Sequence, residues 1–273
     1  MHTGYRPNTA RQKAIDLHVG SRSIAKRMGG MAPGPPILRR FMPRVMDQGS
    51  TSSCTGHAFA AGIAAALGAS SERTGEKWDD FVPSPRAIYA EERGLEMVAT
   101  GLVGDLLEDA GAMPADGIQA IQRFGVVPMG PLCDGRYSDV SERNVNDPAT
   151  LGDVEFSTLL LGAHPITSEW DALEYDLMAA LSHGAPVALA VPGGAQSWRT
   201  ARGNRLRASD FGSEPLDHYV LLYDWVRSPE GEIVWTIRNS WGHSWGHHGD
   251  TPVTTDFLQQ YSGDRYALQV RVV

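Results

Sequence analysis

Cys54 is a candidate nucleophile because of the residues on either side of it. The stretch DQGSTSSCTGHAF places this cysteine after small polar residues and before an alanine-rich apolar run. If a helix begins there, with Ser52 or Ser53 as its N-cap, the sulfur lies beside unpaired backbone N–H groups at the positive end of the helix dipole, and both favour the thiolate. A small buried cysteine would fit the same stretch, so the choice depends on residues elsewhere.

A histidine and an asparagine flank a predicted hairpin far downstream. The runs HYVLLYDWV and EIVWTIRNS are separated by RSPEG, a turn sequence centred near Pro229. Symmetric pairing about that turn sets His218 opposite Asn239. The amide could then orient the imidazole and fix its tautomer, which is the arrangement of base and orienting group that an activated nucleophile needs.

An oxyanion formed next to the sulfur would also need hydrogen-bond donors. Gln48 lies six residues before Cys54, and its side-chain amide is a suitable donor. The backbone N–H of Cys54 could be the second.

Other histidines and the second cysteine offer alternatives. His57 is a rival base, but it lies on the same predicted helix as the nucleophile, so a packing role is expected. Cys133 has no activating neighbours, and a structural role is expected for it. A cluster in a glycine-rich loop could share a metal ion, but without a nearby cysteine it is expected to face solvent: His243, His247 and His248. No metal and no cofactor are therefore expected.

The elements that must position these residues divide into a helical half and a strand-rich half. Phe59, Ile63 and Leu67 recur every four residues and predict a helix from Cys54 that ends at Gly68. Further helices are predicted over residues 85–97, 116–124 and 169–183. Short β-branched or aromatic runs follow, and they predict strands: APVALAVPG, HYVLLYDWV, EIVWTIRN and RYALQVRVV. This segregation favours an α+β fold over alternating βαβ units.

The 273 residues suffice for one large domain or two packed lobes. Residues 1–36, rich in glycine and proline toward their end, are expected to form a flexible leader or arm. We expect a helical lobe carrying Cys54 over residues 37–150 and a strand-rich lobe over 151–273, joined near residues 134–153.

Composition excludes several classes of protein. The net charge is −8 and no long basic run is present, so nucleic-acid binding lacks its main driving force. Two cysteines do not make a disulfide scaffold. No secretory signal is visible, and the longest apolar stretch, residues 58–67, is too short to span a membrane. The cellular location is left open.

The set Gln48, Cys54, His218 and Asn239, with the strings DQGSTSSC, DHYVLL and NSWGHSWG, resembles the papain-like cysteine peptidases of family C1. The similarity is greatest to their disulfide-poor bacterial and phage-type members. It extends from about Pro36 to the C-terminus and includes GIQAIQRFGVVP in the helical half. The resemblance implies an α+β, two-lobed papain-like fold, with a helical left lobe, an antiparallel β-barrel-like right lobe and the active cleft between them.

The resemblance also assigns roles. Cys54 would be the nucleophile, His218 the general base and acid, and Asn239 its orienting partner. Gln48 would donate to the oxyanion, and Trp241 would cover the bond between His218 and Asn239 from water.

Three positions need separate mention. Gly111 is near the place where the family offers a backbone edge to an extended substrate. Thr51 stands where the family has an extra cysteine, so one disulfide of the family is missing. Thr55 stands where an aromatic residue usually follows the nucleophile. The leader is also shorter than a full inhibitory prodomain.

The expected function is that of a cysteine endopeptidase that hydrolyses peptide bonds through an acyl-enzyme, with a protein or peptide as partner. Two alternatives are open. The same machinery could act on another amide, such as a cell-wall peptide, or deamidate a side chain. The domain could also be catalytically idle and serve, through its N-terminal arm, in a larger assembly such as a virion or a secretion machine.

Overall fold

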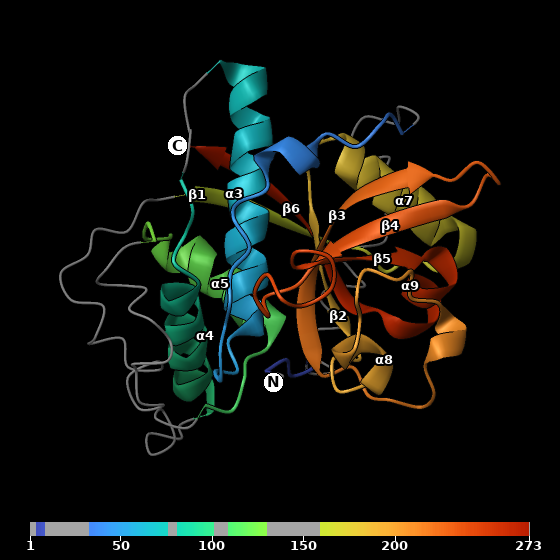
Figure 1. Cartoon of the computed structure of the whole chain (residues 1–273). Helices are drawn as coiled ribbons and strands as arrows, with labels where there is room; N and C mark the ends of the chain where they lie inside the picture. The colour runs from blue at the N-terminus through green and yellow to red at the C-terminus, as the bar shows by residue number, and fades with distance from the viewer. Residues whose placement is uncertain (1–3, 9–32, 76–80, 101–108, 130–158, 273) are drawn as a thin grey trace.

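A long helix stands between two shorter helices and a twisted sheet (Figure 1). The computed structural model describes residues 4–8, 33–75, 81–100, 109–129 and 159–272. The helices and 3-10 turns are η1 (Leu38–Phe41), α3 (Cys54–Thr74), α4 (Pro85–Thr100), α5 (Pro114–Phe124), α7 (Trp170–Ser182), α8 (Gln196–Arg199), η3 (Ala208–Asp210) and α9 (Thr255–Tyr261). The strands are β1 (Leu159–Pro165), β2 (Val187–Val191), β3 (His218–Arg227), β4 (Ile233–Arg238), β5 (Asp250–Thr254) and β6 (Gly263–Val272).

Helix α3 begins at Cys54 as predicted, but the prediction that it ends at Gly68 was wrong. It continues to Thr74 and ends at Gly75, whose φ of 74° suits a helix-terminating glycine. Gly68 instead allows η1 to pack closely, because a Cβ there would lie 2.8 Å from the Phe41 ring. Small residues line most of α3, so neighbouring elements can approach it from several sides and bury it.

The other predicted helices are confirmed with shifted ends. Helix α4 runs three residues past the predicted end, α5 begins two residues earlier at Pro114 and stops before Gly125, and α7 lies within the predicted range. Proline at the first position of α5 costs nothing, since that backbone N–H would have no partner within the helix.

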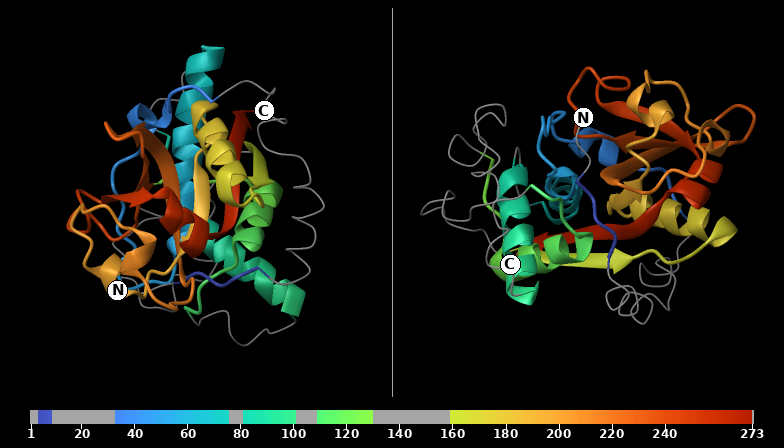
Figure 2. Two further views of the ribbon diagram at one scale, coloured as in Figure 1. Left: turned by 90° about the vertical axis from the view of Figure 1, so that its right-hand side faces the viewer. Right: turned by 90° about the horizontal axis from the view of Figure 1, so that it is seen from below.

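Six strands form one antiparallel sheet in the order β1-β6-β2-β3-β4-β5. The α+β fold is therefore confirmed, with β1 and β5 as the two edges of the sheet. Strands β1 and β5 and helix α9 were not predicted, because their sequences lack a clear alternating or helical pattern. The right-hand view of Figure 2 shows α3 end-on against β6, where Gly62 faces Leu268.

The predicted register of the β3–β4 hairpin was wrong. The strands pair Trp225 with Trp235 and Leu221 with Arg238, with an irregularity between Leu222 and Asp224. The turn is centred nearer Glu230 than Pro229, because Ser228 and Glu232 are joined across it by a hydrogen bond. His218 itself lies opposite Val191 of β2.

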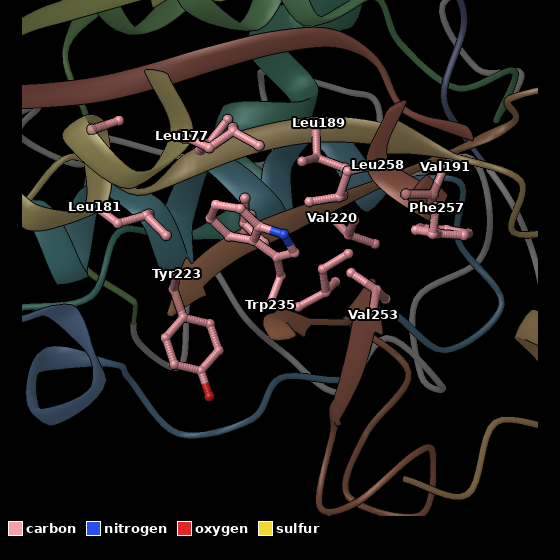
Figure 3. Close-up of a cluster of buried hydrophobic side chains, with 14 of the residues drawn as sticks. Leu177, Leu181, Leu189, Val191, Val220, Tyr223, Trp235, Val253, Phe257 and Leu258 are labelled. Atoms are coloured by element: carbon pink, nitrogen blue, oxygen red, sulfur yellow. The ribbon is translucent and has the colours of Figure 1, made fainter. Parts of the chain in front are cut away.

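Two apolar clusters hold the fold together. Figure 3 shows Trp235 packed among Leu177, Val220 and Leu258, where α7 and α9 cover the sheet. The second cluster lies under α3 and joins it to the sheet through residues such as Leu268. The lobes share elements in both clusters, since η1 contributes Leu38 to the first and β6 contributes to the second.

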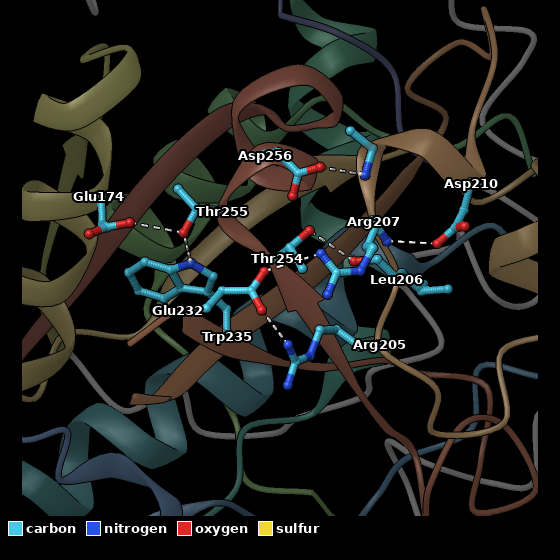
Figure 4. A network of polar contacts seen from close by, with 11 residues as sticks. Glu174, Arg205, Leu206, Arg207, Asp210, Glu232, Trp235, Thr254, Thr255 and Asp256 are labelled. Atoms are coloured by element: carbon cyan, nitrogen blue, oxygen red, sulfur yellow. Dashed lines mark hydrogen bonds and ion pairs between the residues drawn. The ribbon is translucent and has the colours of Figure 1, made fainter. Parts of the chain in front are cut away.

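A polar network supports the hairpin (Figure 4). Arg205 and Arg207 pair with Glu232 at the start of β4. The indole N–H of Trp235 donates to Thr255, whose hydroxyl donates to Glu174 of α7. These contacts fasten the segment before β3 to β4, and β4 to α9 and α7.

Parts of the sequence predictions fall outside the described residues. They include Cys133, the expected connection at 134–153, and residues 9–32 of the expected leader. Residues 4–8 of that leader are described, and they pack between the two lobes. Among the described helices, none is long and apolar enough to cross a membrane.

Candidate active site

The structure brings His218 and Asn239 together. Nε2 of His218 lies 2.7 Å from Oδ1 of Asn239, and both side chains are buried. The backbone N–H of Ser240 also donates to that Oδ1, which identifies it as the amide oxygen. An accepting oxygen requires the proton on Nε2, so Nδ1 carries the lone pair. Nδ1 is buried and has no hydrogen-bond partner among the described residues.

This contact forms despite the misplaced register. Leu221 pairs with Arg238, so the next residue, Asn239, lies opposite Val220. Val220 is two residues along β3 from His218. Side chains at such diagonal positions are on the same face of a sheet and within reach of each other.

Aromatic rings enclose the imidazole. The centroid of Trp241 lies 4.7 Å from that of His218 with a tilt of 32°, and Trp198 meets the imidazole with an edge-on ring at 6.4 Å. Trp245 packs against both indoles and donates its N–H to the Trp198 carbonyl. The imidazole of His218 is thus surrounded by aromatic rings, and Trp241 is one of them.

Cys54 is the first residue of α3 and has no exposed surface. Ser53 occupies the N-cap position, but its side chain makes no capping bond; its hydroxyl bonds to Thr51 instead. Backbone groups of Tyr219, Gly4 and Thr55 act on the thiol so as to lower its pKa. Since Tyr219 directly follows His218, β3 brings its first residues to the helix start.

Burial keeps both expected reacting groups neutral. It raises the pKa of the Cys54 thiol to about 12, against the opposing effect of the backbone hydrogen bonds. Burial lowers the pKa of His218 to about 4, although the bond to Asn239 favours the charged form. Because Nδ1 of His218 has no partner, no thiol–imidazole hydrogen bond exists in this state.

Gln48 is buried between the lobes. Its Nε2 donates to the carbonyl of Thr51 at 2.7 Å, and its Oε1 accepts from the Ser240 hydroxyl at 2.6 Å. Its backbone N–H donates to the carbonyl of Ser240. The chain on either side continues this connection, because Asp47 forms a bridge with Trp241. One short strap therefore joins the loop before α3 to the segment that carries Asn239.

The N-terminal segment, residues 4–8, lies over the start of α3 (near the label N in Figure 1). The carbonyl of Gly4 accepts from the N–H of Ala112, and the N–H of Arg6 donates to the Ala112 carbonyl. On the opposite side, the N–H of Tyr5 donates to the Asp217 carbonyl. Gly4 is so close to the loop before Cys54 that a Cβ would overlap the carbonyl of Ser52. The segment covers Cys54.

The backbone edge expected at Gly111 is formed by its neighbour. Ala112 makes both main-chain hydrogen bonds and pairs in parallel with Tyr5. Gly111, with φ of 78°, lies directly beneath Gly4, and a side chain there would collide with the Gly4 carbonyl. Its N–H donates to the Tyr89 hydroxyl, and its carbonyl accepts from Arg93, which fixes the edge.

The alternatives receive little support. His57 is buried on α3 with Nδ1 bonded to the Ser53 carbonyl, and burial lowers its pKa to about 4. The cluster at the β4–β5 connection is exposed and its rings touch: His243, His247 and His248. No group of three or more possible metal ligands is present within the described ranges.

Sequence reasoning missed several residues of this site. The Ser240 hydroxyl donates to Gln48, and the backbone of Ala112 bonds to the N-terminal segment. The ring of Trp198 packs edge-on against the imidazole of His218. Glu92 of α4 is fully buried and accepts a hydrogen bond from the Thr55 hydroxyl, and burial raises its pKa well above the usual range. Of these residues, only Ser240 could have been suspected from the sequence, because it directly follows Asn239.

Known proteins resemble this chain in part of its sequence and in its fold. Residues 163–260 match the family model described as papain family cysteine protease. A cathepsin L-like protein of Caenorhabditis elegans is 33% identical over 76 residues, which are 28% of this chain and 23% of that protein. A cathepsin L-like peptidase of Aedes aegypti is 36% identical over 76 residues, 28% and 22% of the two chains. The matched part is thus about a quarter of the length of these relatives.

Solved structures match over nearly the whole chain. Xylellain, a cysteine protease from Xylella fastidiosa, superimposes with a TM-score of 0.63 at 23% identity and covers 99% of this chain and 96% of its own. Bromelain from Ananas comosus gives 0.64 at 14% identity, covering 87% and 100%. The fold is papain-like. Residues 163–260 are similar in sequence to the papain family of cysteine proteases.

Proposed function

We propose that the protein hydrolyses peptide bonds with Cys54 as nucleophile, His218 as base and acid, and Asn239 as the group that orients His218. The observation that carries the proposal is the 2.7 Å bond from His218 to Asn239, which leaves the lone pair of the buried Nδ1 available to accept a proton. We also propose that the protein is of the bacterial, disulfide-poor type, which the full-length match to xylellain supports.

In the proposed reaction, Nδ1 takes the thiol proton and the sulfur attacks the substrate carbonyl. The oxyanion receives hydrogen bonds from the backbone N–H of Cys54 and from the amide of Gln48. The imidazolium then protonates the leaving amine, and water hydrolyses the acyl-enzyme with His218 again as base. Trp241 excludes water from the bond between His218 and Asn239, which strengthens it.

The reaction requires that residues 4–8 leave first. In the described state the thiol is fully buried and neutral. When the segment leaves, water and substrate reach the sulfur, and the loss of burial lowers the thiol pKa toward the range in which a thiolate–imidazolium pair forms.

Turnover of casein and of purified cell-wall peptides tests the proposal. The protein and its Gly4→Val variant are compared with the same chains carrying Cys54→Ala. In Gly4→Val the new side chain would overlap the Ser52 carbonyl, so residues 4–8 are displaced. Cys133→Ser is the matched control, because it removes the other cysteine of the sequence. We expect casein cleavage that depends on Cys54 but not on Cys133. Cleavage of cell-wall peptides alone would assign the machinery to another amide, and inactivity of folded protein on both would indicate a structural module.

A further inference from the structure

The side chain of Tyr5 occupies a pocket on the sheet side of the site. It is 7% exposed and stacks on Tyr219, with ring centroids 5.7 Å apart and planes within 7°. Its hydroxyl donates to Oδ2 of Asp264 at 2.6 Å. The pocket therefore combines an aromatic wall with a carboxylate at the far end of the side chain that fills it.

Asp264 is held in an unusual conformation to face this pocket. Its φ of 38° is in the left-handed region, which is uncommon for residues other than glycine, although asparagine, aspartate and histidine adopt it more often than the rest. The Tyr219 hydroxyl fixes it by donating to the Asp264 carbonyl at 2.8 Å. Backbone strain of this kind persists where the surroundings determine it, and it is concentrated at binding sites.

The segment itself supplies the partners of the carboxylate. Oδ2 of Asp264 accepts from the Tyr5 hydroxyl and from the backbone N–H of Asn8. No other described residue donates to this side chain, and the adjacent Arg265 directs its guanidinium to Ser262 and Ser168. When residues 4–8 leave, the carboxylate loses both hydrogen bonds at once.

The backbone edge connects this pocket to a peptide substrate. The N–H and the carbonyl of Ala112 bond to Gly4 and Arg6, and Tyr5 is the residue between them. An extended peptide bound at the same edge would present one residue at the position of Tyr5, with its side chain directed into the pocket.

We propose, on the basis of the proposed function, that this pocket selects a substrate residue whose side chain donates a hydrogen bond to Asp264, with tyrosine preferred. Phenylalanine has the same ring but would leave the carboxylate without a partner. A site built to bond a hydroxyl discriminates against the analogue that lacks it. Asp264 is then a specificity residue and takes no part in the bond-breaking step.

Peptides that differ only by tyrosine, phenylalanine or leucine at this position test the proposal. Full-length Gly4→Val protein and a chain without residues 1–8 should both cleave the tyrosine peptide roughly 10-fold or more faster than the phenylalanine peptide, as kcat/KM. Asp264→Gly fits the left-handed backbone and removes the carboxylate, so it should bring the ratio to about one. Asp210→Gly, at an exposed 3-10 turn, is the matched control and should leave the ratio unchanged.

Calorimetric binding separates this inference from the proposed function. The same peptides are titrated into Gly4→Val protein that also carries Cys54→Ala, so no chemistry is needed. Tighter binding of the tyrosine peptide, lost in Asp264→Gly, supports the pocket even when no cleavage occurs. Equal or weaker binding and cleavage of the tyrosine peptide would overturn it, whether or not the protein is a peptidase.

Discussion

Oδ1 of Asn239 lies 2.7 Å from Nε2 of His218, and the ring of Trp241 packs against the imidazole. The two residues come from different strands, and the amide determines which imidazole nitrogen carries the proton. The unpaired Nδ1 is the consequence of most interest, since a buried acceptor without a partner is costly in a folded protein. Use of that lone pair in catalysis would explain why it is retained.

Asn239→Ala should lower kcat by roughly 10- to 100-fold, a part of what positioned acid–base catalysis supplies. Without the amide, both tautomers of His218 become accessible and the ring can rotate. Asn239→Asp should keep activity but raise the pKa of His218, so the pH–rate profile should shift to higher pH. Asn204→Ala, at an exposed asparagine, is the control. An unchanged kcat in Asn239→Ala would contradict the orienting role.

Gln48→Ala should lower kcat by about 10²–10³-fold with little change in KM, as expected for loss of an oxyanion donor. Ser240→Ala should have a smaller effect in the same direction, because the Ser240 hydroxyl holds Oε1 of Gln48 and acts only through it. In the Gln48→Ala background, Ser240→Ala should therefore add nothing further. Steady-state kinetics of the two single variants and the double variant decide this, with exposed Ser244→Ala as the control.

The elements that carry the expected reacting residues could be predicted from the sequence because each has a local pattern. Cys54 begins an alanine-rich helix, and His218 and Asn239 flank a hairpin with a recognisable turn. The misplaced register did not separate them, since diagonal neighbours on one sheet face remain within reach. The helix end was misjudged because Gly68 is needed for packing against Phe41, and a glycine inside a helix has the same appearance as one that ends it.

The position of residues 4–8 could not be predicted. The segment is held by hydrogen bonds to Ala112, Asp217 and Asp264, which are scattered over the chain. Such contacts leave no periodicity in the sequence. The same reason explains why Ser240 and Ala112 were missed, since a backbone edge and an anchoring hydroxyl depend on tertiary proximity alone.

The stability of the protein should fall as the pH falls from about 6.5 to 4. Burial lowers the pKa of both His57 and His218 to about 4, so the folded state binds these protons less readily than the unfolded state. Each neutral histidine contributes its full amount to the free energy of unfolding above the pKa of the unfolded state. That contribution, roughly 3 kcal/mol for each histidine, is lost as the pH falls to the pKa of the folded state. Urea unfolding at pH 7, 5.5 and 4.5 measures it. His57→Gln should reduce the dependence on pH, and exposed His243→Gln should not.

Gly4→Val should expose the Cys54 thiol to alkylation. Any Cβ at Gly4 would overlap the carbonyl of Ser52, so the segment cannot remain where it is, whereas Gly34 has nothing within 4 Å of its Cβ position and Gly34→Val is the matched control. Iodoacetamide labelling at pH 8, in a Cys133→Ser background, should be at least about 10-fold faster in Gly4→Val, because the thiol becomes accessible and its pKa falls. Equal rates in the two glycine variants would mean that residues 4–8 do not control access to the sulfur.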